Sequence, residues 1–183
     1  MMQLNPTKKT ILEALWQKGK PVKPLEIARQ LGMKNQQAMM HLLNLKNMGY
    51  VSSPEKSHYA ITELGKEALG LPRITKHQAS QILHTKPPEE AFHFYGGIGQ
   101  NLRIQANSLQ DFCDKIQKID ARTIEFHMPR RDFENWLQHL GDSELAKKMA
   151  LLREQGGSGE ELRKKIYEVT LYRCEELRKL ATQ

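Results

Sequence analysis

The stretch from Lys34 to Val51 reads KNQQAMMHLLNLKNMGYV, and it decides how the first half of the chain is interpreted. Apolar residues recur in it at helical spacing: Ala38, Leu42, Leu45 and Met48. This periodicity predicts a helix that buries one face, starts after an N-cap at Asn35 and stops before Gly49. The helix contains no arginine and a single lysine, Lys46, so its exposed face is polar but weakly charged.

Two further helices are expected before this stretch. Pro6-Thr7 opens one that runs through Gln17 and ends at Gly19. A second has Pro24 in its first turn and stops at Gly32, and a short extended piece at Val22 separates the two.

Behind the quoted stretch, YVSSPEKSHYAI predicts two short strands, Tyr50–Ser52 and His58–Ile61, joined by a turn rich in Ser, Pro and Lys. Thr62 and Glu63 then open a fourth helix through Leu69. The order helix, short strand, helix, turn, helix, hairpin resembles a winged helix-turn-helix domain over roughly residues 8–70. Gly49-Tyr50-Val51 and ITELGKEAL, with its Thr-x-x-Gly segment, strengthen the resemblance.

If Ala38, Leu42 and Leu45 face the core, the opposite face of the third helix is free to meet a base-pair edge. Glutamine and asparagine can pair with the N6 and N7 edge of adenine, and methionine can contact a thymine methyl. Lysines at the turn, in neighbouring helices and at the wing tip can contact phosphates: Lys8, Lys9, Lys34, Lys46 and Lys56. The residues expected to bind DNA are Lys34, Asn35, Gln36, Gln37, Met40, His41, Asn44 and Lys56.

The distribution of charge also favours a polyanionic partner for this half. Residues 1–90 hold 13 Lys and Arg against 7 Asp and Glu, whereas residues 91–183 hold 15 against 14. The alternative is a protein-protein adaptor that does not bind DNA, in which Met39, Met40 and Leu43 form an apolar contact stripe. Both functions stay open at the level of sequence.

The fold class expected is mainly α with small β-hairpins: an N-terminal winged helix-turn-helix and a C-terminal helical α+β domain. The boundaries are 1–70 for the first domain, 71–90 for a connecting helix and linker, and 91–183 for the second domain. Thr75 is placed to cap the connecting helix, and Pro87-Pro88 ends the segment.

The second domain is expected to open with a hairpin, because Phe92, Phe94 and the Leu102–Ile104 pair alternate with polar residues around Gly96–Gly99. The glycines are not followed by a helix, so a simple loop is favoured over a phosphate cradle. Helices follow from Ser108 to Ile119, from Pro129 or Asp132 to Gly141, from Asp142 or Ser143 to Arg153, and beyond GGSGEE.

His127, Arg130, Arg131 and Asp132 form the constellation most suggestive of acid–base chemistry. No Ser or Cys nucleophile accompanies them, and Asp132 serves equally well as a helix N-cap, so no enzyme activity, cofactor or metal is expected. Arg173 falls on the apolar stripe of the last helix and is expected either to pair with a carboxylate or to reach water. Cys113 and Cys174 are expected to be buried thiols.

Four stretches of the second half resemble a domain family of unknown function found in archaea and bacteria: FHFYGG, NSLQDF, IEFHMPRRDFENWLQHLGDSELA and ELRKKIYEVTLYRCEEL. The resemblance covers nearly all of residues 92–180 and implies no activity. The function expected from the sequence is a cytoplasmic transcription regulator that binds double-stranded DNA and spans no membrane. A homodimer would read two half-sites, with the second domain used for dimerisation, a protein partner or a signal.

Overall fold

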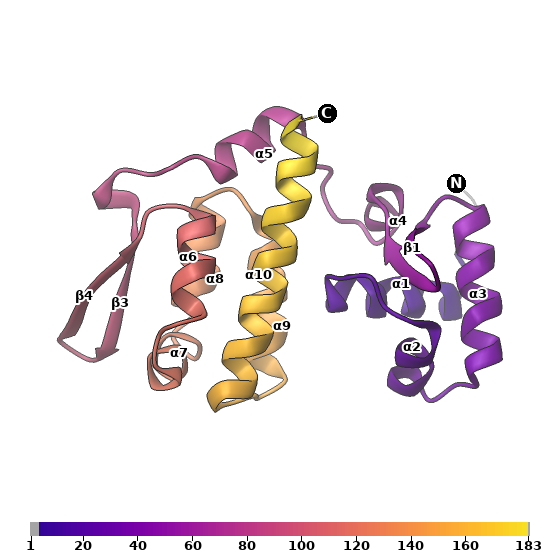
Figure 1. The fold of residues 1–183 in the computed structure, drawn as a ribbon, viewed down its shortest axis with the longest axis horizontal. Helices are drawn as coiled ribbons and strands as arrows, with labels where there is room; N and C mark the ends of the chain where they lie inside the picture. The colour runs from indigo at the N-terminus through magenta and orange to yellow at the C-terminus, as the bar shows by residue number, and fades with distance from the viewer. Residues whose placement is uncertain (1–3, 183) are drawn as a thin grey trace. The chain divides into compact units, whose positions relative to one another are not determined.

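The computed structural model describes residues 4–182 and is mainly helical, with two small antiparallel hairpins (Figure 1). The chain divides into two units, one extending to Arg73 and the other beginning at Ile74. The first unit contains α1 Pro6–Lys18, α2 Pro24–Leu31, α3 Asn35–Asn47, β1 Val51–Glu55, β2 His58–Ile61 and α4 Glu63–Ala68.

The helices of the first unit begin and end within one residue of the bounds that the sequence indicates. Asn5 caps α1 by accepting a 2.8 Å hydrogen bond from the Thr7 amide at Oδ1, and Gly19 ends the helix in the left-handed conformation. α1, α2 and α3 enclose one core, to which they contribute Ile11, Leu12, Leu15, Ile27, Leu42 and Leu45.

The extended piece at Val22 pairs with β2. Val22 and Tyr59 exchange two backbone hydrogen bonds of 3.0 and 2.9 Å, so three chain segments lie edge to edge. β1 is longer than the sequence predicts, running through Pro54 to Glu55 instead of stopping at Ser52. Proline is tolerated there because β1 is an edge strand.

The Thr-x-x-Gly segment closes the hairpin through specific contacts. The Thr62 hydroxyl donates a 2.7 Å hydrogen bond to the Gly49 carbonyl and accepts a 3.1 Å bond from the Gly65 amide, capping α4. Gly65 itself lies directly on the backbone of Tyr50, where a Cβ would come 2.3 Å from the carbonyl oxygen. The motif therefore joins the end of α3, the hairpin and α4.

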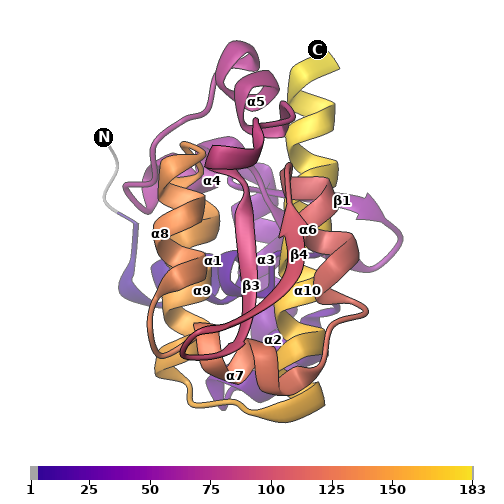
Figure 2. The same ribbon diagram turned by 90° about the vertical axis from the view of Figure 1, so that its left-hand side faces the viewer.

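The second unit is built around its last helix. It contains α5 Lys76–Leu83, a 3-10 turn Pro88–Glu90, β3 Phe92–Gly97, β4 Gln100–Ala106, α6 Leu109–Ile116, α7 Ala121–His127, α8 Asp132–His139, α9 Ser143–Glu154 and α10 Gly159–Thr182. α10 packs against α5, α6, α7 and α9, and β3 packs against α7 (Figures 1 and 2). Phe92 and Phe94 of β3 enter an aromatic cluster with Phe112, Phe133 and Trp136.

Four details of the second unit differ from the sequence prediction. Residues 76–83 form a helix capped by Thr75, but Ala79 and Ile82 lie in the core of this unit, so α5 is not a free connector. ARTIEFH, residues 121–127, forms α7, a helix that the sequence does not predict. α6 ends at Ile116, short of Ile119. Leu102 and Ile104 of β4 are exposed instead of facing the core.

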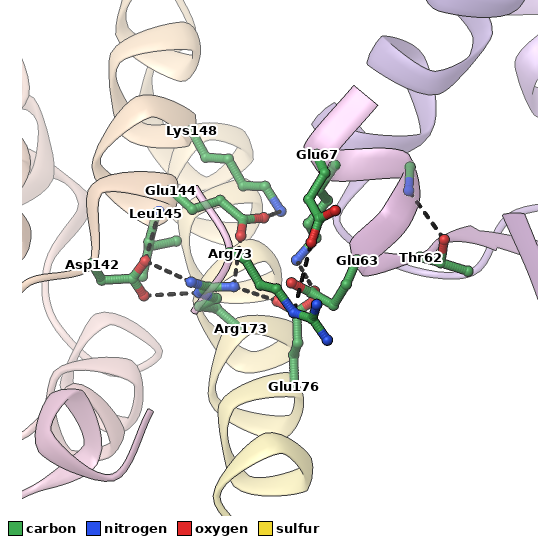
Figure 3. A network of polar contacts seen from close by, with 12 residues as sticks. Thr62, Glu63, Glu67, Arg73, Asp142, Glu144, Leu145, Lys148, Arg173 and Glu176 are labelled. Carbon is green, nitrogen blue, oxygen red and sulfur yellow. Dashed lines mark hydrogen bonds and ion pairs between the residues drawn. The ribbon is translucent and has the colours of Figure 1, made fainter. Parts of the chain in front are cut away.

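Arg173 is buried and paired, the first of the two outcomes expected for it (Figure 3). Its Nε and Nη2 donate to both oxygens of Asp142 at 2.8 and 2.9 Å, and Nη1 donates to Glu144 and Glu176 at 2.7 and 2.6 Å. Burial opposes the charge, but the carboxylates outweigh it and raise the pKa of Arg173. Asp142 also caps α9 by accepting from the Leu145 amide at 3.1 Å, so one cluster joins α9 to α10.

Both cysteines are free and buried, as the sequence predicts, and burial raises the pKa of each thiol to about 12. Within residues 4–182 no helix has the length and apolar character to cross a bilayer. The same residues contain no group of three His, Cys, Asp or Glu side chains suited to hold a metal ion.

Candidate functional site

The first candidate site is the outer face of α3. Ala38, Leu42 and Leu45 are fully buried, as the periodicity predicts, so the opposite face of the helix points to solvent. Seven of the eight residues expected to bind DNA are exposed, and His41 is half-buried at the flank of the helix. Gln36, Met40 and Asn44 lie along the crest, one helical turn apart.

Three of the predicted residues also form the start of the helix. Lys34, not Asn35, is the N-cap, and Asn35 is the first helical residue. The Gln37 side chain accepts a 3.3 Å hydrogen bond from the Lys34 amide at Oε1, which holds the turn between α2 and α3. The N-cap prediction for Asn35 was therefore wrong by one residue, since the Gln37 carboxamide supplies the cap from inside the helix.

The fold brings Lys8 of α1 to the same surface. Its Nζ donates a 2.8 Å hydrogen bond to Asn44 Oδ1 and lies 3.7 Å from the sulfur of Met48. A lysine from the start of α1 is thus fixed beside the crest of α3, 36 residues away in sequence. The sequence indicates Lys8 as a phosphate contact, but it does not show that Lys8 lies beside Asn44.

The surface of α3 is free of acidic side chains. No Asp or Glu occurs between Glu26 and Glu55, whereas Lys34 and Lys46 are exposed at opposite ends of the helix. Lys56 is exposed at the turn between β1 and β2, next to Glu55. The local charge along α3 therefore favours an anion.

The apolar stripe expected for a protein adaptor is only partly present. Met40 and Leu43 are 59% and 46% exposed, but Met39 is half-buried, with its sulfur accepting a 3.4 Å hydrogen bond from the Tyr59 hydroxyl. Met39 therefore belongs to the packing of β2 against α3. Along α3 the exposed large apolar side chains are Met40 and Leu43.

The second candidate site is a pocket of about 500 Å³ in the second unit. It lies between the turn that joins β3 to β4 and the end of α7, which are adjacent in Figure 2. Its lining includes Tyr95, Ile98, Phe126, His127, Arg130 and Asp132. Three members of the constellation singled out from the sequence are therefore brought together. The fourth, Arg131, precedes α8 in the left-handed conformation and does not line the pocket.

His127 is buried with both ring nitrogens engaged. Nδ1 donates a 2.8 Å hydrogen bond to Asp132, and Nε2 accepts a 2.9 Å bond from the Tyr95 amide. Burial lowers the pKa of His127, and the hydrogen bond to Asp132 opposes this only in part. The imidazole is thus held neutral in one tautomer, joining β3 to α7, and offers no open lone pair to a substrate.

Asp132 is the first residue of α8, one of the two helix starts expected from the sequence, and Arg131 takes the N-cap position considered for Asp132. Its carboxylate oxygen Oδ2 accepts from His127 and from Arg130 Nε at 3.1 Å. The Arg130 guanidinium also lies 5.0 Å from the centre of the Phe126 ring. Hydrogen bonding and ring contact together fix the arginine at the edge of the pocket.

The chain was also compared with known proteins. A model of a family of unknown function, DUF5752, matches residues 66–171, which is more than half of the chain. The chain belongs to DUF5752. The DUF5752 segment contains the whole pocket and the Asp142 and Glu144 partners of Arg173, whereas α3 lies outside it. No curated protein and no solved structure matches the chain.

Proposed function

We propose that the first unit is a winged helix-turn-helix domain that binds double-stranded DNA and that the protein acts as a transcription regulator. The order of elements supports the fold: α2, a turn at Gly32–Lys34, α3, and then the β1–β2 hairpin as the wing. The bridge between Val22 and Tyr59 adds the short third strand of such domains. α3 is then the recognition helix, which enters the major groove.

The observation that carries the proposal is the surface of α3. Gln36, Met40 and Asn44 project from a helix whose opposite face is buried, and no carboxylate lies along it. Amides can read adenine and the thioether can contact a thymine methyl, so the crest suits A·T-containing steps. Lys8, Lys34 and Lys46 lie around it and can neutralise phosphates.

The second unit then serves to dimerise, to bind a partner or to sense a signal. A homodimer would place two α3 helices on two half-sites, which multiplies the sequence preference that one helix provides. The competing function is a protein adaptor, favoured by the exposure of Met40 and Leu43. That surface is small compared with the several hundred Å² of a dedicated apolar interface.

A fluorescence anisotropy titration of the full chain with mixed-sequence duplexes at low salt tests the proposal. We expect saturable binding, because nonspecific affinity derives from phosphate contacts. Replacing Gln36 and Met40 with alanine should flatten the preference among duplexes more than it reduces the mean affinity. Absence of binding at low salt would leave the adaptor as the better account of this surface.

A further inference from the structure

The pocket of the second unit shares no residue with α3, and its chemistry points to a ligand of its own. Its volume of about 500 Å³ falls in the range of small-molecule sites. One wall is the end of β3 with the turn Gly97–Gly99, and the other is the end of α7. The two walls are joined at the base by the hydrogen bond from the Tyr95 amide to His127, so the pocket is built on a fixed contact.

The walls offer flat apolar surface to a ligand. Tyr95 and Phe126, two aromatic residues that line the pocket, are half-buried. Ile98, between Gly97 and Gly99 at the tip of the hairpin, is 89% exposed although it also lines the pocket. Burying an isoleucine side chain away from water is favourable. An apolar ligand that covers Ile98 would therefore gain part of this free energy.

Arg130 supplies the polar anchor. Its Nε is committed to Asp132 at 3.1 Å and its plane is held near Phe126, but its two Nη nitrogens make no hydrogen bond or ion pair with residues 4–182. These two nitrogens form the edge of the guanidinium that binds a carboxylate in a bidentate manner. The charge of Asp132 is already shared between His127 and Arg130, which reduces its repulsion of an incoming anion.

We propose that this pocket binds a small organic carboxylate with a flat aromatic or apolar body. The carboxylate pairs with the Nη edge of Arg130, the body lies against Tyr95 and Phe126, and Ile98 covers it from the hairpin tip. A neutral molecule of the same shape gains the apolar contact but leaves the guanidinium edge without a partner. Charge and shape together therefore define the ligand class.

The test uses the full chain with 2-naphthoate as probe and 2-naphthalenemethanol as its neutral counterpart, followed by amide NMR. We expect 2-naphthoate to saturate with a Kd below about 1 mM and the alcohol to bind at least about tenfold more weakly. The amides of Gly97, Ile98 and Gly99 should shift most. Equal binding of acid and alcohol, absence of saturation by 2-naphthoate, or shifts confined to other segments would each overturn the proposal.

A matched pair of variants separates the arginine edge from general surface charge. Arg130→Gln should weaken 2-naphthoate binding about tenfold or more. Arg122→Gln is the control, since Arg122 lies in the first turn of α7, is exposed, pairs with Asp120 and does not line the pocket; it should leave the Kd unchanged. Ile98→Ser should weaken binding roughly threefold through lost apolar contact. If Arg130→Gln and Arg122→Gln bind equally well, the arginine is not the anchor and the proposal is wrong. This comparison measures only the Kd for 2-naphthoate, so its result does not depend on whether the protein binds DNA.

Discussion

At the scale of single residues, His127 belongs to the group of residues most suggestive of acid–base chemistry in the sequence, but in the fold its hydrogen bonds hold structural elements together. Its spacing from Asp132 suggested an acid–base pair, and the hydrogen bond between the two is present at 2.8 Å. The other ring nitrogen, however, accepts from the backbone of a strand 32 residues away. Nothing in the local sequence could show that contact, because it depends on the packing of β3 against α7.

This arrangement makes the stability of the second unit dependent on pH. Burial lowers the pKa of His127 in the folded chain, so the unfolded chain binds a proton first as the pH falls below about 6.5. The contribution of His127 is present above that pH and is lost as the pH falls toward its folded pKa. Protonation would also remove the acceptor of the Tyr95 amide.

Denaturant unfolding of the wild type and of His127→Gln at a series of pH values measures this effect. The difference in unfolding free energy between the two proteins should narrow as the pH falls from about 7.5 to about 5, because only the wild type carries the histidine. The other titrating groups are common to both proteins and cancel. A difference that stays constant over this interval would show that His127 is not held neutral.

Arg173 is a second residue for which the surroundings of the side chain predict how a substitution changes stability. Arg173→Met removes the cation that compensates Asp142 and Glu144, and both carboxylates are buried. Breaking a buried pair by removing one partner costs about 3–5 kcal/mol, so we expect a large fall in the denaturation midpoint. Arg122→Met, in an exposed pair, should leave the midpoint nearly unchanged.

Adding Asp142→Asn to Arg173→Met should recover part of the lost stability, since it removes a buried carboxylate that has lost its cation, whereas Glu144 keeps a 3.6 Å contact with Lys148. Asparagine can still cap α9. Thermal unfolding of the two single variants and the double variant gives this coupling directly. Strict additivity of the two substitutions would contradict a network in which Arg173 and Asp142 depend on each other.

At the scale of elements, the sequence predicts best where caps and periodicity agree. Asn5, Thr62, Thr75, Ser108 and Asp142 all cap the helices expected after them. α7 was missed because it has only seven residues, including the β-branched Thr123 and Ile124, and is stabilised by packing against β3 and α10. β4 has the alternation of a strand with an apolar face, yet Leu102 and Ile104 are exposed, and Ile104 is exposed although it pairs with the buried Phe94.

The join between α4 and the β1–β2 hairpin provides a test at this scale. In Gly65→Ala the new Cβ would lie 2.3 Å from the Tyr50 carbonyl oxygen and 2.7 Å from Cγ1 of Ile61. Because backbone must move, we expect a loss of about 1–3 kcal/mol or more in unfolding free energy. Glu67→Ala, on the exposed side of the same helix, is the control and should change stability little.

Chemical denaturation followed by circular dichroism compares the two α4 variants. Equal midpoints for Gly65→Ala and Glu67→Ala would show that α4 does not press against the backbone at Tyr50, and the role given to the Thr-x-x-Gly segment would then be wrong.

At the scale of the whole molecule, the two candidate sites differ in how much of each can be predicted from the sequence. The face of α3 follows from one helical period, so its residues could be named in advance, apart from the flanking position of His41 and the contact of Lys8 with Asn44. The pocket combines β3, the hairpin turn and the segment 126–132. The sequence indicates Arg130 and His127 as candidate site residues, but Tyr95, Ile98 and Phe126 become their neighbours only through the fold.

The two sites also lie in different units. α3 belongs to the first, and the pocket belongs to the DUF5752 segment that forms most of the second. If α3 binds DNA and the pocket binds a carboxylate, each unit has its own ligand. Each assignment can therefore fail separately.

The salt dependence of duplex binding tests the central claim most directly, because it counts phosphate contacts. For the full chain, log K should fall with log salt concentration with a slope of about −3 to −5 per copy. The double variant Lys34→Gln/Lys46→Gln should reduce the magnitude of the slope by about 2, whereas Lys118→Gln, an exposed lysine of the second unit, should leave it unchanged. No duplex binding at low salt, or equal slopes for all three proteins, would contradict DNA recognition by α3.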